Sequence, residues 1–112
     1  MISKKIFSAK KSLGQNFLKS ELALHKIIEA GEIKPDDIIL EIGPGKGALT
    51  SKLLEKSKHV IAIEKDQELF EFLKNKFIDQ VKDGSLVLVN NDILSSNVNE
   101  NLKSQNYKIK RY

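Results

Sequence analysis

The sequence contains no cysteine and no tryptophan, and it has only two prolines among 112 residues. Without cysteine, disulfide bonds, thiolate metal sites and cysteine nucleophiles are excluded. Its two histidines, His25 and His59, have no second histidine at ligand spacing, so we expect no metal site. No apolar run approaches the ~18 residues of a membrane-spanning helix. The early lysines are not followed by the apolar segment of a secretory signal. We therefore predict a cytoplasmic protein with no membrane partner.

The overall composition is that of one folded domain. Hydrophobic residues make up 40% of the chain and charged residues 30%, which is neither disordered nor membrane-like. The net charge is +4, and the first twenty residues hold five lysines and no acid. We predict a basic flexible tail over residues 1–10 and a folded domain over residues 11–112. Two interpretations of the tail remain open: contact with the phosphate backbone of RNA, or simple solubilisation.

Short apolar runs alternate with helix-like segments along the rest of the chain. We expect strands at 38–42, 59–63 and 86–89, and a further strand could open at 107–109. Helices are expected at 20–30, with Ser20 as N-cap and Gly31 as the stop, at 48–56 and at 66–78. This alternation predicts an α/β protein with a parallel sheet. In such sheets, ligands bind beyond the carboxyl ends of the strands.

The most informative motif is a glycine-rich loop, EIGPGKG at 41–47, between the first of these strands and the helix at 48–56. Glycines that join a strand to a helix let backbone N–H groups approach a ligand closely. The spacing fits the dinucleotide pattern, and Glu64 lies where a ribose-binding acid belongs. However, Pro44 removes one N–H that could bind pyrophosphate. Glu41 also places a negative charge beside the loop, which is unfavourable near phosphate but favourable near a cation.

S-adenosylmethionine meets these preferences better than NAD. It has no phosphate, it carries sulfonium and ammonium charges, and it presents a ribose diol and an adenine amino group. Glu64 and Asp92 follow successive strands, and a carboxylate such as that of Asp92 suits the adenine amino group. The alternative is that Glu41 and Glu64 are ordinary acids at strand ends and that Asp92 belongs to a structural turn.

Four segments in order resemble the ribosomal-RNA adenine N6,N6-dimethyltransferases. They are KSLGQNFL at 11–18, LEIGPGKGALT at 40–50, IEKD at 63–66 and NDI at 91–93, and the similarity extends over about residues 10–109. The resemblance implies a Rossmann-like S-adenosylmethionine-dependent methyltransferase fold. It also implies transfer of two methyl groups to N6 of each of two adjacent adenines near the 3′ end of small-subunit rRNA, with the pre-ribosomal small subunit as partner.

The resemblance also assigns roles to individual residues. Asn16 and Leu18 would close over the methionine end of the cofactor. Gly43 and Gly45 would let the backbone approach it. Glu64 would bind the ribose hydroxyls and Asp92 the adenine amino group, while the N-terminal lysines would help to hold rRNA. No residue of this chain is assigned a catalytic role.

One motif of the family is missing. There, the fourth strand leads into Asn-(Leu/Ile)-Pro-Tyr, which binds the target adenine, whereas here Lys110, Arg111 and Tyr112 follow the expected strand entry. We therefore expect only the N-terminal portion of the family's domain, truncated after about three parallel strands, without dimethylase activity by itself. The alternatives are a non-catalytic RNA-binding module with a vestigial cofactor pocket, and an NAD-binding Rossmann fragment.

Overall fold

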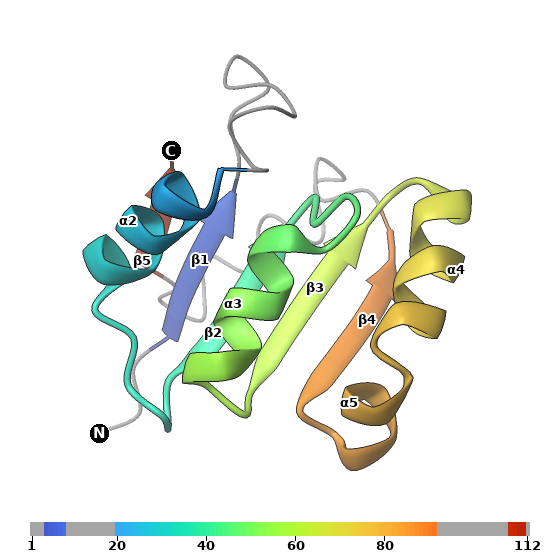
Figure 1. Ribbon diagram of the computed structural model, residues 1–112. Coiled ribbons are helices and arrows are strands. Elements are labelled where there is room, and N and C mark those ends of the chain that lie inside the picture. The colour runs from blue at the N-terminus through green and yellow to red at the C-terminus, as the bar shows by residue number, and fades with distance from the viewer. Residues whose placement is uncertain (1–3, 9–19, 92–107, 112) are drawn as a thin grey trace.

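The structure is a computed structural model that describes residues 4–8, 20–91 and 108–111. Its centre is a five-stranded, fully parallel sheet in the order β4-β3-β2-β1-β5 (Figure 1). The strands are β1 (Lys4–Ser8), β2 (Ile38–Ile42), β3 (Val60–Glu64), β4 (Leu86–Asn90) and β5 (Lys108–Arg111). Because all five run in the same direction, their carboxyl ends share one edge of the sheet, which is the upper edge in Figure 1.

Among the described residues, one helix follows β1, one follows β2 and two follow β3. They are α2 (Glu21–Gly31), α3 (Ala48–Lys56), α4 (Gln67–Lys76) and α5 (Ile78–Asp83). Helices α2 and α3 lie in front of the sheet in Figure 1, and their apolar residues join those of α4 in the main core. That core contains Phe7, Leu24, Ile27, Ile28, Ile39, Leu49, Leu53, Val60, Ala62, Leu73, Phe77 and Leu86. The strands thus bury one face under helices, as expected for βαβ units.

The opposite face of the sheet has a smaller cluster. Ile6, Leu40 and Ile63 are its buried members, and each comes from a different strand. In the part of the chain that the structure describes, no helix residue belongs to this cluster. Val87, which pairs with Ile61 in the same row, is 50% exposed. The described helices therefore cover one face of the sheet.

The predicted α/β class is confirmed, and most elements lie where the sequence placed them. Strand β2 has the expected bounds, and β3 and β4 agree within one residue. Ser20 caps α2, since its hydroxyl accepts a hydrogen bond from the Ala23 N–H at 3.2 Å. Asp66 caps α4 in the same way through the Leu69 N–H at 3.0 Å. Local capping chemistry therefore fixed these helix starts.

The expectation of a flexible tail over residues 1–10 is wrong for Lys4–Ser8, which form β1 between β2 and β5. Ile6 and Phe7 are buried on opposite faces of the sheet. The buried Lys5 ammonium donates to the Glu32 carbonyl oxygen at 2.5 Å and to Asp37 Oδ2 at 2.7 Å. A paired lysine is compatible with burial, so the charge did not exclude a strand. Strand β5 overlaps the segment at 107–109 where the sequence allows a further strand to open, so β1 and β5 together extend the sheet beyond the predicted three strands.

Gly31 does not stop the first helix. It is the last residue of α2, and the left-handed position is taken by Glu32, with φ of 49°. The glycine is needed for packing, because a Cβ at this position would lie 2.6 Å from Cζ of Phe7 in β1. The helix expected at 66–78 also divides, since α4 ends at Lys76 and α5 begins after Phe77.

Candidate cofactor site

The glycine loop, residues 43–47, joins β2 to α3 at the carboxyl edge of the sheet (Figure 1). It begins against β3, where the Gly43 N–H donates to the Ile63 carbonyl oxygen at 2.9 Å. It closes on itself through the Gly47 N–H, which donates to the Pro44 carbonyl oxygen at 3.0 Å. Gly47 is then the N-cap of α3. The loop therefore has a defined conformation, held by its own backbone and by β3.

Two of the predicted site glycines, Gly43 and Gly45, are not packed against the described residues. Their φ values are 69° and 60°, and within the described part of the chain a Cβ built on either would meet no atom within 4 Å. Packing among these residues therefore does not explain the two glycines. Their left-handed backbone conformation favours glycine, and the lack of side chains lets a ligand approach the loop backbone closely.

Glu64 connects the glycine loop to the segment between β3 and α4. It is the last residue of β3 and is buried. Its Oε1 accepts a hydrogen bond from the Gly45 N–H at 3.1 Å, and its Oε2 accepts one from the Asp66 N–H at 2.9 Å. The structure thus brings Glu64 and the glycine loop together as the sequence predicted. Each carboxylate oxygen has a further lone pair, so hydroxyl donors can still be accepted.

Asn90 was not among the predicted site residues. It pairs with Glu64 in the β3–β4 register, and its Nδ2 donates to the Glu64 carbonyl oxygen at 2.9 Å. The Asn91 N–H donates to the same oxygen at 3.2 Å. These bonds fasten the end of β4 to the end of β3. The sequence offers one signal for Asn90, a polar amide at the end of an apolar strand. The same pattern is typical of a turn, and the sequence alone favoured the turn.

Glu41 is a buried acid two residues before the loop. It is 3% exposed, and the Thr50 hydroxyl of α3 donates to its Oε1 at 2.5 Å. Burial raises the pKa of Glu41 to about 7; the Thr50 bond opposes this rise and the nearby Glu64 charge adds to it. Thr50 was also missed. Its position in the first turn of the helix after the loop, facing β2, was the available signal.

Three predicted cofactor residues, Asn16, Leu18 and Asp92, lie outside the described residues. Within residues 4–8, 20–91 and 108–111, no group of three or more histidine, cysteine, aspartate or glutamate side chains is arranged to hold a metal ion. None of the helices in these ranges is long and apolar enough to cross a membrane.

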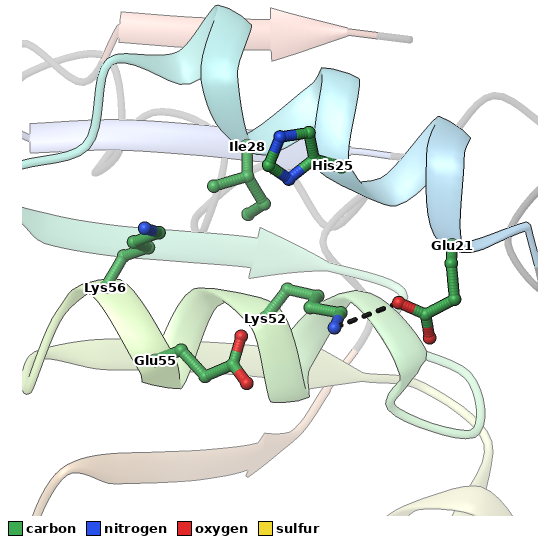
Figure 2. A pocket seen from close by; sticks show the side chains of 6 residues that line it. All are labelled: Glu21, His25, Ile28, Lys52, Glu55 and Lys56. Atoms are coloured by element: carbon green, nitrogen blue, oxygen red, sulfur yellow. Dashed lines mark ion pairs between the residues drawn. The ribbon is translucent and has the colours of Figure 1, made fainter.

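A separate small pocket of about 140 Å³ lies between α2 and α3 (Figure 2). It is lined by Glu21, His25, Ile28, Lys52, Glu55 and Lys56. Lys52 Nζ pairs with Glu21 Oε2 at 3.0 Å across the two helices. The pocket shares no residue with the glycine loop, and its exposed mixed charges are those of a solvated helix contact.

Comparisons with known proteins agree with this geometry. The family model for ribosomal RNA adenine dimethylase matches residues 6–112. The ribosomal RNA small subunit methyltransferase A of Malacoplasma penetrans is 43% identical over 108 residues, covering 96% of this chain and 38% of the relative. That of Clostridium botulinum is 39% identical over 105 residues, covering 94% of this chain and 37% of the relative. The chain thus spans less than two fifths of the length of these relatives.

Solved structures show the same relationship. A 23S rRNA methyltransferase, ErmE, superposes with a TM-score of 0.63 at 33% identity over 72% of this chain and 32% of its own. A dimethyladenosine transferase from Plasmodium falciparum gives a TM-score of 0.61 at 31% identity over 82% of this chain and 40% of its own. The predicted Rossmann-like methyltransferase fold is therefore confirmed. The chain belongs to the ribosomal RNA adenine dimethylase family.

Proposed function

We propose that this chain forms the S-adenosylmethionine-binding part of an rRNA adenine N6,N6-dimethyltransferase. The proposed reaction modifies two adjacent adenines near the 3′ end of small-subunit rRNA, in the pre-ribosomal small subunit and in the cytoplasm. The observation that carries the proposal is the contact between Glu64 and the Gly45 N–H at the carboxyl edge of the sheet. Family membership supplies the reaction class.

The chemistry of the loop suits a cationic cofactor without phosphate. Two buried carboxyl groups, Glu41 and Glu64, lie beside it. Pro44 has no N–H, and the Gly45 N–H is already bound to Glu64. A pyrophosphate would therefore find few free donors and two acids nearby. This observation supports S-adenosylmethionine over NAD.

In this proposal, Gly43 and Gly45 present backbone to the cofactor, and Glu64 accepts hydrogen bonds from its ribose hydroxyls. Asn16, Leu18 and Asp92 complete the site as the family resemblance implies. When bound, the cofactor supplies an electrophilic methyl group. The residues of the chain bind and orient it, because positioning of the reacting groups contributes much of the acceleration in such a displacement.

One of the N-terminal lysines is removed from the proposed contact with rRNA. Lys5 is buried in the sheet and bonded to Asp37. Its charge is neutralised within the domain, so Lys5 does not belong to the proposed RNA contact. Lys10, Lys11 and Lys19 lie outside the described residues and remain part of it.

Cofactor binding is tested first, by calorimetric titration of the folded chain with S-adenosylmethionine. We expect binding by the native chain and a loss of at least about tenfold in Glu64→Gln, because the amide accepts fewer hydrogen bonds than the carboxylate. Glu55→Gln, an exposed acid on α3, is the matched control. Equal affinity of all three proteins would contradict the assignment of Glu64.

Methyl transfer is tested in a chimaera, in which this chain replaces the matching residues of the Malacoplasma penetrans relative. With labelled cofactor and unmethylated small subunits, we expect N6,N6-dimethyladenine in the rRNA. The chimaera that carries Glu64→Gln should be strongly impaired. A folded chimaera that binds cofactor but methylates no adenine would refute the proposed reaction.

A further inference from the structure

The carboxyl group of Glu41 is buried and only partly satisfied. Its neighbours across the strands are Phe7 on β1 and Ala62 on β3, and neither brings a charge. From α3, Thr50 donates one hydrogen bond to Oε1. Within the described part of the chain, Oε2 accepts no hydrogen bond, and the charge that acts on Glu41 is that of Glu64. The surroundings thus favour a neutral carboxyl group over a carboxylate.

The position of this acid relates it to the glycine loop. Glu41 is two residues before Gly43, and Thr50 fixes its side chain against the first turn of α3, directly after the loop. The loop is also bound to Glu64. A cation bound beside the start of the loop would favour the ionised form of Glu41, because opposite charges in a poorly solvated site interact strongly.

We propose that Glu41 is a proton-linked recognition residue, which holds a proton in the cofactor-free protein and releases it to solvent when cationic S-adenosylmethionine occupies the loop. The inference rests on the proposed function of the loop. The carboxyl O–H bond breaks, the proton passes to the buffer, and the new carboxylate balances the positive charge of the cofactor. The burial of an unpaired charge is thereby avoided while the site is empty.

A defined pH dependence follows. Since Glu41 has a pKa of about 7, the free protein is largely protonated at pH 6. Each cofactor bound should then release close to one proton, and affinity should rise up to about tenfold per pH unit below pH 7. Above pH 8 the release should vanish, since Glu41 is already ionised.

The experiment is calorimetry of the folded chain with S-adenosylmethionine at pH 6, in two buffers of different ionisation enthalpy. The dependence of heat on buffer gives the number of protons released. We expect about 0.9 for the native chain and for Glu55→Gln, and less than about 0.2 for Glu41→Gln, whose amide does not titrate. Equal release by the native chain and Glu41→Gln would overturn the inference and leave cofactor binding intact.

A second variant and a second measurement keep the test independent of how Glu41→Gln folds. Thr50→Val removes the bond that favours the ionised acid, so the pH profile of affinity should shift to higher pH. Carbon NMR of the Glu41 carboxyl group should show titration near pH 7 without cofactor. Titration near pH 4.5 would refute the inference whatever the cofactor does. A folded chain that binds no cofactor at any pH would refute the proposed function and the inference together.

Discussion

At the residue scale, Gly47 and Gly84 show how one backbone conformation serves two different purposes. Their φ values are 88° and 85°. A Cβ on Gly47 would lie 2.6 Å from Phe77 Cε2 and 3.0 Å from Leu73 Cδ2, whereas a Cβ on Gly84 would meet none of the described residues within 4 Å. At Gly84, glycine is needed only for the left-handed conformation of the turn before β4. Gly47 also lets the start of α3 approach the buried end of α4.

This contrast gives a matched pair of variants. Gly84→Ala should lower the free energy of unfolding by about 1–2 kcal/mol, the cost of a left-handed conformation for an L-residue. Gly47→Ala should cost about 1–3 kcal/mol more, because the ring of Phe77 must move in a packed core. Urea denaturation of both variants measures the difference. Equal losses would mean that the core accommodates the methyl group without strain.

At the element scale, β1 shows what the sequence could and could not predict. Strands β2 to β4 are apolar runs between turn residues, and Ser20 and Asp66 are the N-caps of α2 and α4, so local chemistry was sufficient. The segment Lys4–Ser8 has adjacent lysines, which locally resemble a solvated tail. Its burial depends on Asp37, 32 residues away, and a partner that distant leaves no local signal.

The candidate site also contains residues that the sequence predicted and residues that it did not. The glycine loop and Glu64 were predicted because spacing and topology bring strand ends to one edge. Thr50 and Asn90 were not, because they act on Glu41 and on the Glu64 backbone through side-chain contacts that depend on packing. The sequence therefore predicted the position of the loop and of Glu64, whereas the contacts that Thr50 and Asn90 make with Glu41 and Glu64 required the structure.

The Lys5–Asp37 pair makes β1 testable. Lys5→Met preserves the apolar stem but leaves Asp37 buried without its ammonium partner, so we expect a loss of about 3–5 kcal/mol in the free energy of unfolding. Lys5→Met with Asp37→Asn should recover much of this, since no unpaired charge remains. Lys26→Met, an exposed change on α2, is the control. A loss for Lys5→Met no larger than for the control would show that β1 does not bury this pair.

At the scale of the whole molecule, two buried acids give stability opposite dependences on pH. Burial alone would raise the pKa of Asp37, but the Lys5 ammonium and the Lys34 N–H outweigh it and hold that pKa below its usual value. Asp37 therefore stabilises the fold above about pH 4, and this contribution is lost as pH falls through the lowered pKa. In Lys5→Met, the decrease in the free energy of unfolding at acid pH (the acid limb of the pH profile) should be smaller. An unchanged acid limb in that variant would contradict this role.

Glu41 has the opposite effect on the pH dependence of stability. Its pKa rises from 4.5 in the unfolded chain to about 7 in the folded protein, so between these values the folded state binds more protons. Stability should fall as pH rises from about 4.5 to 7 and then level off, with a total change of about 3 kcal/mol from this group. Glu41→Gln should remove this slope while leaving the limb below pH 4 unchanged, as measured by urea denaturation at each pH. If S-adenosylmethionine draws the proton from Glu41, saturating cofactor should flatten the same slope in the native chain, because the bound state no longer holds the extra proton. A slope that persists unchanged in Glu41→Gln would place the titration on another group and separate Glu41 from both effects.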